Sequence, residues 1–171
     1  MKFVRAPAPL IFIALASGAG FAGAMLSGCT RVEQAPAVSY TSLDGRRSDL
    51  AALRGHVVLV NFWATSCAPC VEEMPAMAAN WRRFSPRGFE TLAVAVQYDA
   101  PALVSNFAQS RALPFPVVID NTGEIAHRFG DVQYTPTSLL INKRGEIVRR
   151  WVGKTDFAAL APLIAQLDDE G

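Results

Sequence analysis

Two cysteines and a glutamate lie close together in the stretch FWATSCAPCVEEMP, residues 62–75. Cys67 and Cys70 are separated by two residues and come directly after an apolar run. A zinc site would need two further ligands, and the sequence has no second CxxC pair and no histidine at a finger-like spacing. A purely structural disulfide across so short a loop would stabilise the fold little. The pair is therefore best interpreted as reactive.

The elements expected around the pair predict which cysteine attacks. Residues 57–63 form a β-favouring run that is apolar except for Asn61, and the apolar spacing after the cysteines predicts an amphipathic helix over about 68–84. Cys67 would then lie at a helix N-terminus, where free N–H groups and the helix dipole stabilise an anion. Because the thiolate is the attacking form, we expect Cys67 to be the nucleophile and Cys70 to resolve the mixed disulfide.

The rest of the chain alternates strands with helices. Two more strand–helix pairs are expected, over residues 91–96, 100–111, 115–119 and 124–129. Residues 138–141 and 146–152 predict an antiparallel hairpin, a shorter hairpin or lead-in is expected within 39–53, and Thr155 is expected to cap a last helix. This order predicts one α/β domain, in which helices cover both faces of a central mixed sheet.

The start of the chain has the composition of an export signal. Lys2 and Arg5 precede an uncharged stretch, residues 6–30, that has a short hydrophobic centre. Residues 26–29, Leu-Ser-Gly-Cys, resemble the lipobox of bacterial lipoproteins, in which the chain is cut before the cysteine and that cysteine is lipidated. An ordinary cleavage site at residues 22–24 and an uncut membrane span are the alternatives.

The lipobox interpretation divides the chain into three parts. We expect a lipoprotein signal peptide over residues 1–28, the lipidated Cys29 and a tether over 29–38, and a folded domain over 39–171. Of the 16 basic residues two lie in the signal peptide, so 14 remain against 15 acidic residues. A nearly neutral chain without a phosphate-binding glycine loop predicts no nucleic-acid partner. We also expect no metal and no cofactor.

At this point the sequence resembles the thioredoxin superfamily, and more closely its exported TlpA/ResA-like branch. The resemblance covers residues 38–168 and rests on the stretches VVLVNFWATSCAPC, EMP, VVIDNTGEIAHRFG, YTPT and SLLINKRGEIVRRWVG. It implies a thioredoxin-like fold. It also implies that Pro136 is a cis proline beside the cysteines and that Thr135 offers its backbone to an extended substrate. We place Trp63 with Thr135 and Pro136 among the substrate-binding residues.

The acids after the cysteines differ in their expected roles. Glu73 lies three residues after Cys70 and hence on the same helix face, whereas Glu72 is expected to point to solvent. Thioredoxin-like proteins usually have a buried carboxylate at the position of Asn61, and here it is missing. In the ResA-like branch a glutamate matching Glu73 lies by the active site, so the resemblance implies a role for Glu73 in proton transfer with Cys70. A solvated helix glutamate is the plainer alternative.

Two departures from the family pattern bear on reactivity. Ser66 replaces the tryptophan that commonly precedes the first cysteine, which would leave the sulfur more open. Ala68 and Pro69, between the cysteines, contribute no cation. Strongly oxidising relatives often have a histidine there, which stabilises the reduced thiolate, so this pair is expected to be comparatively reducing.

The resemblance implies an enzyme, a membrane-tethered thiol-disulfide oxidoreductase on the extracytoplasmic side. It would reduce disulfides of exported proteins, for example in cytochrome c maturation or metal-site assembly, with electrons from an integral membrane thiol reductant. One alternative is a copper-binding module that uses Cys67, Cys70 and His127, although related copper carriers have a longer cysteine spacing. Another is a thiol peroxidase, in which a threonine stands three residues before the cysteine, whereas Thr65 is two before Cys67.

Overall fold

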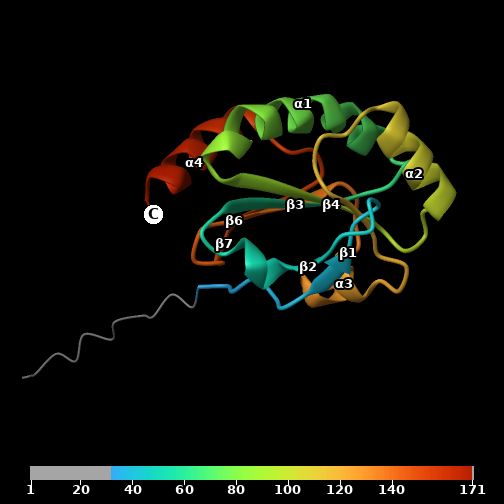
Figure 1. Cartoon of the computed structure of the whole chain (residues 1–171), viewed down its shortest axis with the longest axis horizontal. Coiled ribbons are helices and arrows are strands. Elements are labelled where there is room, and N and C mark those ends of the chain that lie inside the picture. Colours follow the sequence, from blue (N-terminus) through green and yellow to red (C-terminus); the bar gives the residue numbers. More distant parts are fainter. Residues whose placement is uncertain (1–31, 171) are drawn as a thin grey trace, which may run out of the picture. The chain divides into compact units, whose positions relative to one another are not determined.

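A five-stranded sheet forms the centre of the computed structural model, which describes residues 32–170. The strand order is β5-β4-β3-β6-β7 (Figure 1). The strands are β3 (Val57–Trp63), β4 (Phe89–Ala95), β5 (Val117–Ile119), β6 (Thr137–Ile141) and β7 (Ile147–Val152). β3, β4 and β5 are parallel, while β6 is antiparallel to both β3 and β7. The prediction of a mixed sheet that ends in an antiparallel hairpin is confirmed.

Helices cover both faces of this sheet, as predicted (Figure 1). On one face lie α1 (Ala68–Phe84), α2 (Pro101–Ser110) and α4 (Phe157–Asp169), and the short turn η2 (Ser85–Arg87) follows α1. On the other lie α3 (Glu124–Arg128), the hairpin of β1 (Ser39–Thr41) and β2 (Arg47–Asp49), and η1 (Leu50–Leu53). The fold is thioredoxin-like α/β.

Alternating side chains of β3 supply two separate cores. Leu59 and Trp63 pack with apolar residues of α1, α2 and α4, whereas Val60 and Phe62 pack with those of α3 and the N-terminal segment. Every residue of β3 is buried, because successive side chains of a strand point to opposite faces and both faces are covered. β3 is therefore a rigid support for the residues that follow it.

The N-terminal boundary of the domain differs from the prediction. The backbone N–H of Ala35 donates to Gly145 at 2.8 Å, and the carbonyl of Glu33 accepts from Ile147 at 2.8 Å. Ala35 and Val38 are buried in the core. Residues 33–38 are thus part of the domain rather than of a free tether.

The cap of the last helix is also one residue away from its predicted position. Asp156, not Thr155, is the N-cap of α4, and its carboxylate accepts hydrogen bonds from the N–H groups of Ala158 and Ala159, both at 3.0 Å. Aspartate and threonine both suit this position, so the sequence alone did not discriminate between them.

The expected signal peptide and Cys29 lie outside the described residues. Between residues 32 and 170, no helix combines the length and the apolar character that crossing a bilayer would require.

Candidate active site

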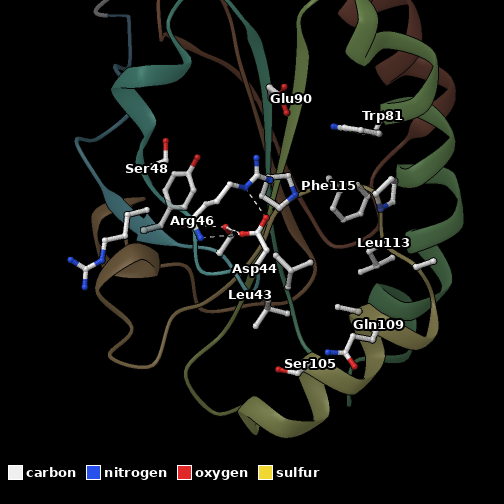
Figure 2. A pocket seen from close by; sticks show the side chains of 18 of the residues that line it. Leu43, Asp44, Arg46, Ser48, Trp81, Glu90, Ser105, Gln109, Leu113 and Phe115 are labelled. Atoms are coloured by element: carbon white, nitrogen blue, oxygen red, sulfur yellow. Dashed lines mark hydrogen bonds and ion pairs between the residues drawn. The ribbon is translucent and has the colours of Figure 1, made fainter.

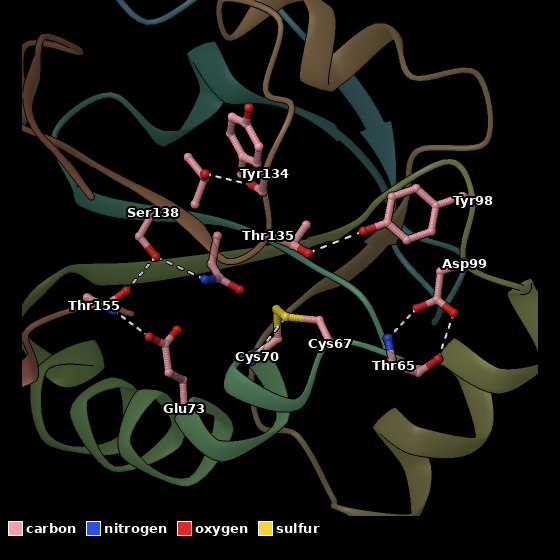
Figure 3. Close-up of a disulfide and its surroundings, with 12 residues drawn as sticks. Thr65, Cys67, Cys70, Glu73, Tyr98, Asp99, Tyr134, Thr135, Ser138 and Thr155 are labelled. Atoms are coloured by element: carbon pink, nitrogen blue, oxygen red, sulfur yellow. Dashed lines mark hydrogen bonds between the residues drawn. A yellow bond between two sulfur atoms is a disulfide. The ribbon is translucent and has the colours of Figure 1, made fainter. Parts of the chain in front are cut away.

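Cys67 and Cys70 are joined by a disulfide at the start of α1 (Figure 3). β3 ends at Trp63, and a short turn leads to Cys67, which is the N-cap of the helix. The Cys67 sulfur accepts a hydrogen bond from the N–H of Cys70 at 3.2 Å. This N–H is one of the free donors at the helix N-terminus, so the structure provides the anion-stabilising position expected for Cys67.

The two sulfurs differ in accessibility. Cys67 is half-buried and its neighbours Ser66, Ala68 and Pro69 are exposed, whereas Cys70 is 1% exposed. An incoming disulfide can therefore approach Cys67 but not Cys70. This difference matches the predicted roles of attacking and resolving cysteine.

The loop before β6 lies next to the disulfide. The Thr135–Pro136 peptide bond is cis, as the resemblance implied, and Figure 3 shows the Thr135 side chain directed toward Tyr98. Pro136 is buried and Thr135 is half-buried. Within residues 32–170 no hydrogen bond engages the backbone N–H or carbonyl of Thr135. That backbone is free to pair with an extended segment of another chain.

Glu73 is buried behind Cys70 rather than solvated. Its side chain points into the domain, and the residue is 6% exposed. One carboxylate oxygen accepts a hydrogen bond from the backbone N–H of Thr155, and the other oxygen has no partner. Burial raises the pKa of Glu73 above its ordinary value, against the opposing effects of the Thr155 N–H and the positive charge of Lys154. A carboxyl group with a raised pKa is suited to exchanging a proton.

A chain of buried polar side chains connects Glu73 with β3 (Figure 3). The Asn61 amide donates to the Ser138 hydroxyl at 2.9 Å, and the hydroxyls of Ser138 and Thr155 are 2.8 Å apart. The Asn61 side-chain oxygen is buried without a partner. Asn61 thus places a neutral group at the β3 position where thioredoxin-like proteins usually have a buried carboxylate. The buried carboxylate that reaches this chain of polar side chains belongs to Glu73.

Glu72, the neighbouring acid, points outward as predicted. It is exposed and forms an ion pair with Lys154 at 2.5 Å. Pro75 lies inside α1.

Trp63 does not contact the solvent, so the prediction that it binds substrate is wrong. Its side chain is 0% exposed and packs on Phe107, with 5.2 Å between the ring centroids. Because it is the last residue of a strand covered on both faces, its side chain points into the core beneath α1 and α2. Trp63 supports the site from below.

The residues named in the two alternative functions have other partners. The His127 side chain is 2.5 Å from the carboxylate of Asp131 in an exposed pair. In the described part of the chain no three His, Cys, Asp or Glu side chains are grouped as metal ligands. Thr65 donates its hydroxyl to Asp99 at 2.7 Å, so this proton is not directed at Cys67 as a peroxidase site would require.

Two residues of the site were missed by the sequence reasoning. Tyr98 and Asp99 follow β4, which lies beside β3 in the parallel part of the sheet. Asp99 accepts two hydrogen bonds from Thr65, and the Tyr98 hydroxyl is 3.2 Å from that of Thr135. The sequence does hold a signal for them, since they are a polar pair directly after a buried strand. The carboxyl ends of neighbouring parallel strands meet at one edge of a sheet, so residues after β4 are expected near those after β3.

A large pocket lies away from the disulfide. It has a volume of about 900 Å³ and is bordered by the β1–β2 hairpin, by Trp81 of α1 and by the segment between α2 and β5 (Figure 2). Its polar groups include the ion pair of Asp44 and Arg46, at 2.6 Å. It contains neither the cysteines nor the Thr135 loop. This pocket is therefore separate from the redox site.

Comparisons with known proteins agree with this geometry. The AhpC/TSA family model matches residues 32–150. The chain is 35% identical over 122 residues to the thiol-disulfide oxidoreductase ResA of Bacillus thuringiensis, which covers 71% of this chain and 69% of the relative. It resembles the solution structure of a thioredoxin-type protein from Neisseria meningitidis, with a TM-score of 0.73 and 38% identity over 79% of this chain and 90% of that one. It also resembles a thiol:disulfide interchange protein of Chlorobium tepidum, with a TM-score of 0.74. The identity is 29%, and the match covers 81% of this chain and 97% of that one.

Proposed function

We propose, from the premise that this chain belongs to the AhpC/TSA family and is a thiol-disulfide oxidoreductase similar to ResA, that it reduces disulfides of exported proteins from a membrane tether. The observation that carries this proposal is the Cys67–Cys70 disulfide, with the accessible sulfur at the N-cap of α1. The client would be a protein with a disulfide, and cytochrome c maturation and metal-site assembly are the processes in which we expect it.

The exchange consumes the reduced form of the pair. The Cys67 thiolate attacks one sulfur of the client disulfide, the client S–S bond breaks, and the first client thiolate leaves. Cys70 then loses its proton and attacks the Cys67 sulfur, which releases the second client thiolate and closes the Cys67–Cys70 disulfide. Two electrons pass to the client, whose two thiolates take up protons. A dithiol reductant must then reopen the disulfide, and we assign this step to an integral membrane thiol protein.

Glu73 is suited to accept the proton of Cys70 in the second step. Both residues are buried on the same face of α1, and the Glu73 carboxylate has one oxygen without a hydrogen-bond partner. Burial disfavours the charged carboxylate and raises its pKa, which makes Glu73 a stronger base once it is ionised. We assign Glu73 to this proton transfer.

The direction of the reaction follows from the groups near Cys67. The segment between the cysteines has no cation that would selectively stabilise the reduced thiolate. A pair whose thiolate is less stabilised gives up its electrons more readily. We therefore assign this protein to disulfide reduction rather than to disulfide formation.

Trapping of a client tests the proposed function. Cys70→Ser leaves Cys67 able to attack and removes the group that resolves the mixed disulfide, so clients should accumulate on Cys67. The variant is expressed in the native host, adducts are separated without reductant, and partners are identified by mass spectrometry. Cys67→Ser is the matched control and should capture none. If Cys70→Ser captures no thiol-linked protein and the wild type cannot reduce a disulfide-bonded test protein, the proposal is wrong.

The membrane tether needs a separate experiment. We expect the wild type to sediment with membranes and Cys29→Ser to lose the lipid anchor and move to the soluble exported fraction. An unchanged membrane fraction for Cys29→Ser would contradict anchoring by this residue, and reductase activity would still be measurable in both proteins.

A further inference from the structure

The segment after β4 touches both sides of the redox site. Tyr98 and Asp99 are neighbours in the chain, but Figure 3 shows their side chains directed at different partners. Asp99 reaches Thr65, two residues before Cys67, and Tyr98 reaches Thr135, next to the cis proline. Two adjacent residues thus connect the loop of the nucleophile with the loop that faces a client.

Asp99 holds the loop of the nucleophile through both of its carboxylate oxygens. One oxygen accepts the backbone N–H of Thr65 at 2.5 Å, and the other accepts the Thr65 hydroxyl at 2.7 Å. Asp99 is 6% exposed, so these bonds are shielded from water. The N–H of Cys67 donates to the carbonyl of Ala64 at 3.1 Å, which closes the same turn. Asp99 therefore fixes the backbone from which Cys67 enters α1.

Tyr98 contacts the loop that contains Thr135. Its ring is 66% exposed, and its hydroxyl lies 3.2 Å from that of Thr135. Both residues border a pocket of about 340 Å³ next to the cis proline, which a client side chain could enter. Tyr98 is thus placed where a client segment paired with Thr135 would pass.

We propose that Asp99 is a positioning residue for Cys67 and that Tyr98 positions the Thr135 loop, so that residues 98–99 act as a brace between nucleophile and client. The inference rests on the proposed disulfide exchange. Attack on a disulfide needs the incoming sulfur in line with the bond that breaks, and a misplacement of about 1 Å in a reacting group can cost on the order of 100-fold in rate. The brace fixes this alignment without touching the reacting atoms.

Asp120 offers a matched control for a buried aspartate that only stabilises the fold. It is 3% exposed, and its two oxygens accept the N–H groups of Ile125 and Ala126 at 3.2 and 2.8 Å. Asp99→Ala and Asp120→Ala each remove a buried carboxylate that accepts two hydrogen bonds. Only Asp99 is bound to the loop of Cys67.

The experiment compares reduction of a disulfide-bonded test protein by the reduced full chain and its variants. We expect Asp99→Ala to lower kcat by about tenfold and Asp120→Ala by less than roughly twofold, after both are normalised to the folded fraction. Asp99→Asn should regain most of the activity, because an amide can accept from the Thr65 N–H and donate to its hydroxyl. Tyr98→Phe should raise KM by about threefold, since it removes one hydrogen bond of the client-facing loop.

Three results decide the inference. Equal losses of kcat in Asp99→Ala and Asp120→Ala, with an active wild type, would overturn the brace and leave the proposed function intact. If Asp99→Ala does not fold, Thr65→Ala replaces it: it removes one of the two bonds and should lower kcat by about threefold, and an unchanged kcat would overturn the inference. A wild type that reduces no disulfide would overturn the proposed function and the brace with it.

Discussion

The carboxylate of Glu73 in α1 accepts a hydrogen bond from the backbone N–H of Thr155, which lies 82 positions further along the chain. The neighbouring residues form a second link, because Glu72 pairs with Lys154 at the surface. Two consecutive acids of α1 are thus attached to two consecutive residues before α4. The outer link is exposed to water, whereas the inner one is buried and places a titrating group behind Cys70.

The buried link predicts how stability depends on pH. Burial raises the pKa of Glu73 above its ordinary value of 4.5. As pH rises past 4.5, Glu73 therefore keeps its proton in the folded protein after it has lost it in the unfolded chain. The contribution of Glu73 to stability is then fully present below that value and is lost as pH rises through the folded pKa. Glu73→Gln keeps an oxygen for the Thr155 N–H and does not titrate, so its stability relative to the wild type should increase with pH.

Urea unfolding of the oxidised proteins between pH 4 and pH 8 measures this effect, since oxidised cysteines do not titrate. Glu72→Gln is the matched control. It removes only an exposed ion pair that solvent screens, and should show no comparable trend. A constant difference between Glu73→Gln and the wild type over this range would argue against a raised pKa of Glu73.

Asn61→Asp places a carboxylate in β3, where thioredoxin-like proteins usually have one, and should lower the stability of this protein. The Asn61 oxygen has no donor and the residue is 1% exposed, so an aspartate there would bury a poorly bonded charge. We expect a loss of about 1–3 kcal/mol at pH 7. The new carboxyl would have a raised pKa, so the loss should shrink as pH falls towards 4.

Asn61→Leu is the control for this variant, because both lose the amide that donates to Ser138 but leucine adds no titrating group. Its deficit in urea unfolding should not vary with pH. If Asn61→Asp were as stable as the wild type at pH 7, an unrecognised donor would have to reach this position.

The parts of the fold that depend on local pattern could be predicted from the sequence. The unbroken apolar run of β3, the three- and four-residue spacing in α1 and the turn residues between β6 and β7 each encode their element directly. The position of Cys67 follows from the boundary between β3 and α1. These features need no knowledge of distant contacts.

Features that depend on tertiary contacts were missed. Whether Trp63 points inward is decided by the helices that cover β3, and the sequence around it is equally compatible with an exposed ring at a client surface. The bonds of Asp99 and Tyr98 join residues more than 30 positions apart, and no local pattern encodes them. The polar composition of residues 33–38 predicts a tether, and composition does not indicate the backbone hydrogen bonds that join this segment to the β6–β7 hairpin.

The cap of α4 gives a local prediction. Asp156→Ala removes the acceptor for two N–H groups of the helix and should cost about 1 kcal/mol, whereas Asp156→Ser retains an acceptor and should cost less. Denaturant midpoints of the two variants provide the measurement. Equal stability of Asp156→Ala and the wild type would mean that water or another group satisfies these donors.

Because Trp63 is buried, substitutions of it should change the stability of the protein and leave client binding unchanged. Trp63→Ala would leave a large cavity beneath α1 and α2 and should cost about 3–5 kcal/mol. Trp63→Phe keeps most of the packing against Phe107 and removes an indole N–H that is buried without a partner, so its cost should be smaller. Because the ring does not reach the surface, KM for a disulfide-bonded test protein should be unchanged in Trp63→Phe at equal folded fraction. A large rise in KM with wild-type stability would instead place Trp63 in contact with the client.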